Sequence, residues 1–204
     1  MLNSKGFDLW ADGYDKSVGL SDEAGTYPFA GYKSILNEIY NRVLSHSGKT
    51  VLDIGFGTGT LTAKLYEQGC QIYGQDFSGR MLELAQKKMP EARLYQGDFS
   101  LGLAEDLKRN KYDAIIATYS IHHLTDPQKV RLIESLLPLL NEGGSIYIGD
   151  VAFATRAELE ACMEQIGAGW DADEIYPVFD ELKKSFPKME FEQLSCCAGL
   201  LILK

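Results

Sequence analysis

Three glycines and an acid follow the first buried-looking apolar run of the chain. Residues 51–62 read VLDIGFGTGTLT and place Gly55, Gly57 and Gly59 at alternate positions, with Asp53 just before them. Glycine loses more conformational freedom on folding than any other residue, so glycines this close together indicate a backbone that turns tightly or approaches a ligand. The segment therefore predicts a ligand-binding loop.

The residue types around this loop restrict the ligand. A phosphate-binding P-loop needs a lysine that the segment lacks, and the dinucleotide fingerprint G-x-G-x-x-G needs a glycine where the chain has Thr60. A carboxylate at Asp53 some 5 Å from a pyrophosphate would cost about 3 kcal/mol at an effective dielectric constant near 20. Beside an ammonium or a sulfonium the same carboxylate is favourable. The loop is therefore expected to hold a positively charged ligand without phosphates.

Further polar residues follow the next apolar runs. Asp76 ends the second run, 21 positions after Gly55, and Asp98 follows the third in the segment GDF. Both are carboxylates placed to accept hydrogen bonds. His122 and His123 follow the fourth run in TYSIHHL. Histidine carries protons near neutral pH, but adjacent side chains usually point in different directions, so at most one is expected to face a substrate. A packing role for both histidines stays open.

Alternating strand and helix patterns must position these residues. Strands are expected at 50–54, 71–75, 92–96, 112–118 and 144–150, and helices at 32–48, 58–68, 78–88, 101–109, 126–140, 155–166 and 176–186. The end of the chain, 188–204, reads as two strands joined by a turn around Cys197 to Gly199. Repeated strand–helix–strand units predict a doubly wound α/β sheet with helices on both faces, whose loops meet at the carboxyl ends of the strands.

The composition narrows the class of protein. A chain of 204 residues is expected to form one domain, and its net charge of −9 disfavours binding to nucleic acid or to an anionic membrane. No signal peptide and no apolar run of membrane-spanning length is recognised, so the cytoplasm is the expected location. With four cysteines in no C-x-x-C pair and three histidines, no metal site is expected. The neighbouring Cys196 and Cys197 are expected in the core.

These features together resemble those of a known family. DIGFGTG resembles the (D/E)-x-G-x-G-x-G first motif of the class I S-adenosylmethionine-dependent methyltransferases, and the resemblance runs from WADGYD near the N-terminus to the final hairpin. It is most similar to small stand-alone bacterial members. The resemblance implies a Rossmann-like seven-stranded sheet, mostly parallel with an antiparallel C-terminal strand. It also implies S-adenosylmethionine as cofactor and S-adenosylhomocysteine as product.

The resemblance also assigns parts of the chain to the site. It implies an arm and helix at 1–48 that form part of a lid, a cofactor-binding core at 49–150, a substrate-side roof at 151–187 and a hairpin at 188–204. Asp76 would bind the ribose, Asp98 the adenine amino group, and Tyr14 would lie over the cofactor. The full set of expected cofactor contacts is Tyr14, Asp53, Gly55, Phe56, Gly57, Gly59, Asp76, Phe77, Met81, Gly97, Asp98, Phe99 and Thr118.

The expected reaction is methyl transfer by in-line displacement to a small molecule. A general base is needed only when the acceptor arrives protonated, and the candidates, in order, are His123, His122, Tyr14 and Tyr119. Between Arg156 and Lys183 lie eight acids and no basic residue. This run indicates either a solvated helix face or a roof that attracts an amine or other cationic acceptor.

Two alternative functions stay open at this point. One is a protein that binds S-adenosylmethionine or S-adenosylhomocysteine without catalysis, since binding and turnover use the same residues. The other is an NAD(P)-dependent reductase with a variant glycine loop. The reductase is disfavoured because no tyrosine of the chain has a lysine four positions later. The oligomeric state is not predicted.

Overall fold

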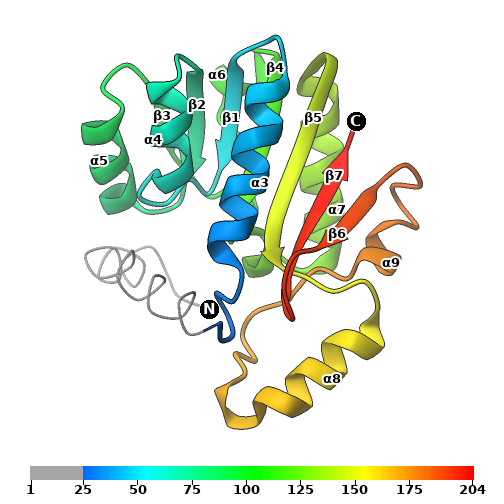
Figure 1. Ribbon diagram of the computed structural model, residues 1–204. Coiled ribbons are helices and arrows are strands. Elements are labelled where there is room, and N and C mark those ends of the chain that lie inside the picture. Colours follow the sequence, from blue (N-terminus) through cyan, green and yellow to red (C-terminus); the bar gives the residue numbers. More distant parts are fainter. Residues whose placement is uncertain (1–24) are drawn as a thin grey trace.

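The computed structural model describes residues 25–204, so Tyr14 and the arm around it lie outside the described residues. Its centre is one seven-stranded sheet in the order β3-β2-β1-β4-β5-β7-β6 (Figure 1). The strands are β1 (Thr50–Ile54), β2 (Gln71–Asp76), β3 (Arg93–Gln96), β4 (Tyr112–Thr118), β5 (Leu140–Val151), β6 (Glu190–Gln193) and β7 (Ala198–Leu203). Only β7 runs antiparallel to its neighbours β5 and β6, as the family resemblance implies.

Helices cover both faces of the sheet because the central strands β1, β4, β5 and β7 present apolar side chains to both sides (Figure 1). The helices are α3 (Tyr32–Ser45), α4 (Thr60–Glu67), α5 (Gly79–Lys88), α6 (Glu105–Lys108), α7 (Asp126–Leu136), α8 (Arg156–Ile166) and α9 (Phe179–Leu182). One core packs residues such as Ile35 of α3 and Leu61 of α4 on the sheet. The other packs Leu107 of α6 and Ile133 of α7 on the opposite face.

The helices expected at 32–48 and 126–140 end a few residues early, at Ser45 and Leu136, and two further predicted helices are much shorter than expected. The expected helix at 101–109 is only α6, because Asp98 Oδ1 accepts the backbone N–H of Ser100 at 2.8 Å in a turn, and Gly102 then takes a φ of 122°. The expected helix at 176–186 is only α9. Its first residues are extended instead, because Val178 pairs with Phe153 in an isolated bridge.

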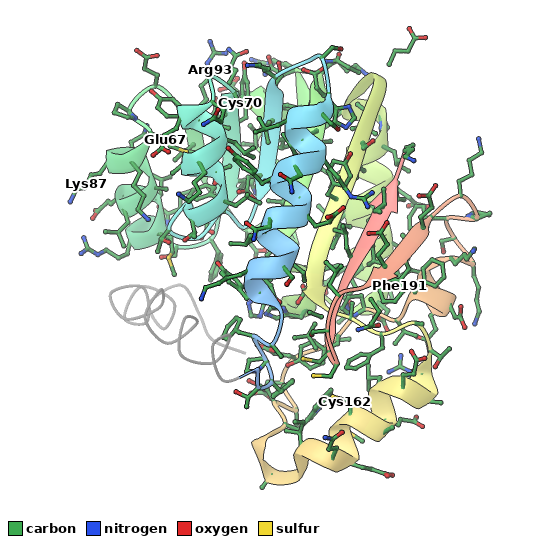
Figure 2. All side chains as sticks on the ribbon, viewed as in Figure 1. Glu67, Cys70, Lys87, Arg93, Cys162 and Phe191 are labelled. Atoms are coloured by element: carbon green, nitrogen blue, oxygen red, sulfur yellow. The ribbon has the colours of Figure 1, made fainter. Side chains whose placement is uncertain are left out.

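The C-terminal hairpin is present, but its turn lies earlier than predicted. The strands β6 and β7 leave Leu194 to Cys197 as the turn, and Ser195 holds it by accepting the backbone N–H of Ala198 at 2.9 Å. Cys197 is buried as expected, whereas Cys196 is exposed. On β6, Phe191 stacks on Phe179 of α9 with ring centroids 5.4 Å apart, so the hairpin also anchors the segment after α8 (Figure 2).

The carboxyl ends of the parallel strands lie at one edge of the sheet, and α8 lies beyond that edge (Figure 1). The loops after β1, β2, β3 and β4 therefore converge there, which is where open α/β sheets bind ligands. Among residues 25–204, no helix has the length and apolar character needed to cross a membrane.

Candidate active site

A cavity of about 450 Å³ opens at the carboxyl edge of the sheet. Its walls come from the ends of four strands, from the residues before α3 and from the segment after α8. The described lining residues are Tyr27, Pro28, Phe29, Tyr32, Asp53, Gly55, Phe56, Gly57, Thr58, Thr60, Leu61, Asp76, Phe77, Met81, Asp98, Phe99, Ser100, Thr118, Tyr119, Ser120, His122, His123, Leu124, Val151, Gly169, Asp171 and Glu174. Among the residues that the structure describes, this lining contains five acids and no lysine or arginine, so it suits a cationic ligand better than a phosphate.

Two glycines of the loop after β1 contribute directly to this cavity. Gly55 has a φ of 72°, and a Cβ added there would lie 2.4 Å from the Cβ of Ser120, so no other residue fits. Gly57 has a φ of 55° and leaves open space on its Cβ side. The loop thus brings bare backbone to the cavity wall, as the sequence predicts for a ligand-binding loop.

Gly59 and Gly97 do not line the cavity. Gly59 has a φ of 76° and precedes α4, and a Cβ there would come within 3.3 Å of Ala85 on α5. Its visible role is close packing of the two helices. Gly97 donates its backbone N–H to the Asp76 carbonyl at 2.8 Å and continues the pairing of β2 with β3.

Asp53 lies at the floor of the cavity and is 1% exposed. Its Oδ2 accepts the Thr62 hydroxyl at 3.0 Å, and its Oδ1 has no hydrogen-bond partner among the described residues. Burial, and next the nearby Asp76, raise the pKa of Asp53 to about 7, while the Thr62 hydroxyl lowers it. A buried carboxylate oxygen without a partner is costly, and a cationic ligand group in the cavity would satisfy it.

Asp76 ends β2 and holds two backbone segments. Its Oδ2 accepts the N–H of Gly57 at 2.8 Å, and its Oδ1 accepts the N–H of Ser78 at 2.9 Å. Ser78 in turn caps α5 by accepting the N–H of Met81. A carboxylate offers about four acceptor sites, so a carboxylate at this position suits ligand hydroxyl groups as well as these two N–H groups. It therefore fixes the glycine loop in addition to facing the cavity.

Most other expected cofactor contacts also line the cavity. Phe77 and Met81 come from the start of α5, Asp98 and Phe99 follow β3, and Thr118 ends β4. Phe56 lies in the glycine loop and lines the same cavity. The structure thus brings together the described residues of the predicted set other than Gly59 and Gly97.

Tyr119 marks the loop after β4 as strained. Its φ is 49°, a left-handed value that a bulky residue adopts at a cost of order 1–3 kcal/mol. Its ring packs 5.4 Å from Phe29 and 5.1 Å from Tyr32, measured between ring centroids. The surrounding aromatic residues therefore hold the strained residue at the cavity wall, with Ser120 next to it.

His122 is fixed by Asp150, the penultimate residue of β5. The Asp150 Oδ1 lies 2.6 Å from His122 Nδ1, and both side chains are buried. Burial acts to lower the pKa of His122, but the Asp150 carboxylate outweighs it, so the pKa of His122 is raised. His122 Nε2 faces Glu174 Oε1 at 3.4 Å. Asp150 thus holds Nδ1 of His122, and Nε2 faces Glu174 in the cavity wall.

His123 lines the same cavity with a different electrostatic character. Its ring centroid lies 4.2 Å from that of His122, with the planes inclined at 68°. Burial, and next the neighbouring His122, lower the pKa of His123 to about 3. A group this weakly basic is a poor proton acceptor near neutral pH, which weighs against His123 as the first choice of general base.

The roof segment docks on this loop through its backbone. The N–H of Ile175 donates to the His122 carbonyl at 2.8 Å, which places Glu174 against the histidines. Of the eight acids in the run, Asp171 and Glu174 line the cavity. Others have structural partners elsewhere: Glu158 caps α8, and Glu181 binds Arg156 at 2.6 Å. The acidic run is thus largely a surface with two acids directed to the site.

Several cavity residues were not predicted from the sequence. Tyr27 and Phe29 reach the cavity from the segment before α3, Tyr32 from the first turn of α3, and Glu174 from the segment after α8. Asp150 of β5 was not predicted either; it lies behind the cavity wall and contacts His122 there. Asp150 had one available signal, because it is an acid at the end of an apolar strand pattern. Glu174 had none that separates it from the other acids of the roof.

Strand order, glycine loop and acidic cavity together define the class I methyltransferase architecture. The comparisons with known proteins agree: a family model described as a methyltransferase domain matches residues 51–144. A methyltransferase of Geobacillus sp. (strain WCH70) is 38% identical over 91% of this chain and 87% of its own length. One of Anoxybacillus flavithermus is 40% identical over 78% of this chain and 72% of its own length.

Solved structures share the fold. Magnesium protoporphyrin IX methyltransferase from Synechocystis PCC 6803, with bound S-adenosylhomocysteine, has a TM-score of 0.70 and 18% identity, covering 98% of this chain and 94% of its own. The DhpI complex with the same ligand has a TM-score of 0.69 and 16% identity, covering 97% and 92%. The chain belongs to the class I S-adenosylmethionine-dependent methyltransferases, and its cofactor is S-adenosylmethionine. This membership favours neither the non-catalytic nor the reductase alternative.

Proposed function

We propose that this chain transfers a methyl group from S-adenosylmethionine to a small-molecule acceptor bound between the loop after β4 and the roof. The single observation that supports the proposal most is the Oδ1 of the buried Asp53, which has no hydrogen-bond partner within residues 25–204 and lies at a cavity lined by acids and by bare glycine backbone. S-adenosylmethionine carries an ammonium and a sulfonium and supplies an activated methyl group. The positive charges of such a ligand complement the carboxylates that line the cavity.

The cofactor is proposed to lie along the ends of β1 to β4. Asp53, Gly55, Phe56 and Gly57 would contact its amino-acid part, and Asp76 the ribose hydroxyls. Phe77, Met81, Asp98 and Phe99 would surround the adenine, with Thr118 near the methionine end. The protein's main contribution to rate is then alignment and exclusion of water, which can supply about 7–11 kcal/mol in well-oriented reactions.

The acceptor is proposed to lie against Tyr119, His122, His123 and Glu174. Asp171 and Glu174 make this end of the cavity acidic, which favours positive charge there. The charge is carried by the acceptor itself, as in an amine, or is supplied by a separately bound cation. A cytoplasmic enzyme acting on a dissolved metabolite is consistent with this arrangement.

The cofactor assignment is tested by calorimetry with S-adenosylmethionine and with NADH. We expect binding of the first and none of the second, and a preference for NADH would overturn the assignment. Asp76→Ala should weaken S-adenosylmethionine binding at least tenfold, because it removes the acceptor for the ribose and the anchor of Gly57 together. Asp106→Ala, an exposed acid paired with Arg109 on α6, is the matched control.

The transfer itself is tested by screening amines, thiols and carboxylates for production of S-adenosylhomocysteine. An acceptor that turns over at a rate proportional to enzyme supports the proposal. Tight cofactor binding with no turnover on any compound of a broad screen would instead favour a binding protein.

A further inference from the structure

Three side chains at the acceptor end of the cavity form a set of metal-ligand type. Nitrogen atoms of His122 and His123 and a carboxylate oxygen of Glu174 all lie within 4.8 Å of one another. Each of the three residues lines the cavity. Two imidazoles and one carboxylate are donors that suit divalent transition metals such as Mn²⁺, Fe²⁺, Co²⁺, Ni²⁺ and Zn²⁺.

The His122 ring is oriented as a metal ligand usually is. Asp150 Oδ1 holds Nδ1 at 2.6 Å, and Asp150 is itself fixed because the same oxygen accepts the N–H of Val151 at 2.8 Å. A carboxylate on one ring nitrogen fixes the tautomer and leaves Nε2 with its lone pair for a cation. That nitrogen is the one that faces Glu174.

Glu174 is held on the other side of the set by a similar outer contact. The hydroxyl of Tyr176 donates to its Oε2 at 2.5 Å, and Tyr176 in turn contacts the hydroxyl of Tyr27. This leaves Oε1 directed to His122. The bond from Ile175 N–H to the His122 carbonyl fixes the spacing of the two segments. Ligands from two distant segments are therefore supported by an outer layer of hydrogen bonds.

We propose that His122, His123 and Glu174 bind a divalent transition-metal ion at the acceptor end of the cavity. Metal–ligand bonds of about 2.1 Å need donor atoms roughly 3–4 Å apart, so binding would draw the farthest pair, now within 4.8 Å, together by at most about 1–2 Å. Three protein ligands leave coordination positions open toward the cavity, as in catalytic metal sites. The cation would supply the positive charge that the acidic lining lacks.

The acceptor class that fits such a site is a small molecule with an acidic O–H group. This choice of acceptor rests on the proposed methyl transfer. Coordination lowers the pKa of the hydroxyl, which loses its proton to water. The oxygen then forms the new bond to the methyl carbon while the carbon–sulfur bond breaks and its electron pair stays on sulfur. The metal keeps its oxidation state.

The test uses metal-free protein and needs no acceptor. Mn²⁺ is added to isotopically labelled protein, and the imidazole signals of the three histidines are followed by NMR. His122 and His123 should broaden at substoichiometric Mn²⁺, while His46, which contacts Tyr147, should not. Equal or absent broadening of all three would overturn the proposal.

Affinity supplies the second measurement. Because Cys196 is exposed and thiols bind Zn²⁺, the titrations by calorimetry are made in a Cys162→Ser, Cys196→Ser background. Glu174→Gln and His123→Gln should each weaken Zn²⁺ binding at least tenfold, whereas Glu164→Gln on the exposed face of α8 should change it less than twofold. If the parent binds Zn²⁺ no better than Glu174→Gln and His123→Gln do, His122 merely bridges two carboxylates and the metal site is rejected.

The metal site and the proposed function can fail separately. Binding of S-adenosylmethionine to the parent protein is measured with and without a chelator. Cofactor binding without any metal binding would reject the site and leave the methyltransferase proposal intact. Metal binding at the predicted residues without cofactor binding would support the site and reject the methyltransferase proposal.

Discussion

At the scale of single residues, we expect Asp53 to link cofactor binding to pH. Its pKa is raised to about 7 in the protein without ligand, mainly by burial. A cationic ligand group beside the carboxylate lowers that pKa again, so below pH 7 binding releases a proton. Binding must therefore strengthen as the pH rises toward 7 and level off above it.

The prediction is a change of about tenfold in S-adenosylmethionine affinity between pH 6 and pH 8, since one proton is released. Calorimetry at several pH values measures it. In Asp53→Asn the dependence should flatten and the affinity at pH 8 should fall. Titration of the ligand's own amino group occurs with both proteins and cancels in the comparison. A profile unchanged by the substitution would remove Asp53 from the cofactor site.

The residues that the sequence did and did not predict differ in their partners. Asp53, Asp76 and Asp98 were predicted because each lies at or just beyond the carboxyl end of its own strand. Glu174 was not, because its role depends on the Ile175–His122 backbone bond between segments more than fifty residues apart. Local sequence patterns do not predict a contact between segments this far apart in the chain.

At the scale of elements, Lys129 supports the start of α7 and the histidine loop. Its side chain is fully buried, and its ammonium donates to the Leu124 carbonyl at 2.7 Å and to Asp126 at 3.0 Å. The ammonium thereby satisfies the carbonyl that ends the loop of His122 and His123. A methionine has a similar shape but cannot donate these bonds.

Lys129→Met should therefore lower the free energy of unfolding by about 1–3 kcal/mol, because a buried carbonyl loses its partner. Urea unfolding measures this loss. Lys87 on α5 points away from the sheet into solvent (Figure 2), and Lys87→Met should stay within about 0.5 kcal/mol of the parent protein. Equal stability of both variants would show that the buried ammonium contributes nothing to the loop.

The elements themselves were predictable to the extent that their patterns are local. The five parallel strands follow from apolar runs, although β5 extends further toward the N-terminus than expected. The helix expected at 176–186 fails because Val178 pairs with Phe153, a residue 25 positions away. The hairpin turn was predicted around Cys197 to Gly199, but it lies at Leu194 to Cys197. It forms there because the Ser195 hydroxyl accepts the backbone N–H groups of Cys197 and Ala198.

At the scale of the whole molecule, the cavity draws its walls from segments that span most of the described chain. A ligand that touches all of them must favour the folded state over the unfolded chain. At a cofactor concentration one hundred times Kd, the free energy of unfolding should rise by about 2.7 kcal/mol.

Urea unfolding with S-adenosylmethionine and with NADH at matched concentrations checks this expectation. Stabilisation by the first alone supports one ligand site shared by all these segments. A cofactor that binds tightly but does not shift the unfolding midpoint would indicate comparable binding to the unfolded chain, which the buried site does not allow.

The attachment of the roof to the histidine loop has a consequence for diversity among related enzymes. The bond from Ile175 to His122 joins main-chain atoms, so it is indifferent to which side chains stand at either position. Replacements at the proposed acceptor end, at Glu174 for example, are expected to leave this attachment in place. We expect point substitutions there to change the substrate preference while the geometry between residues 151–187 and the sheet stays the same.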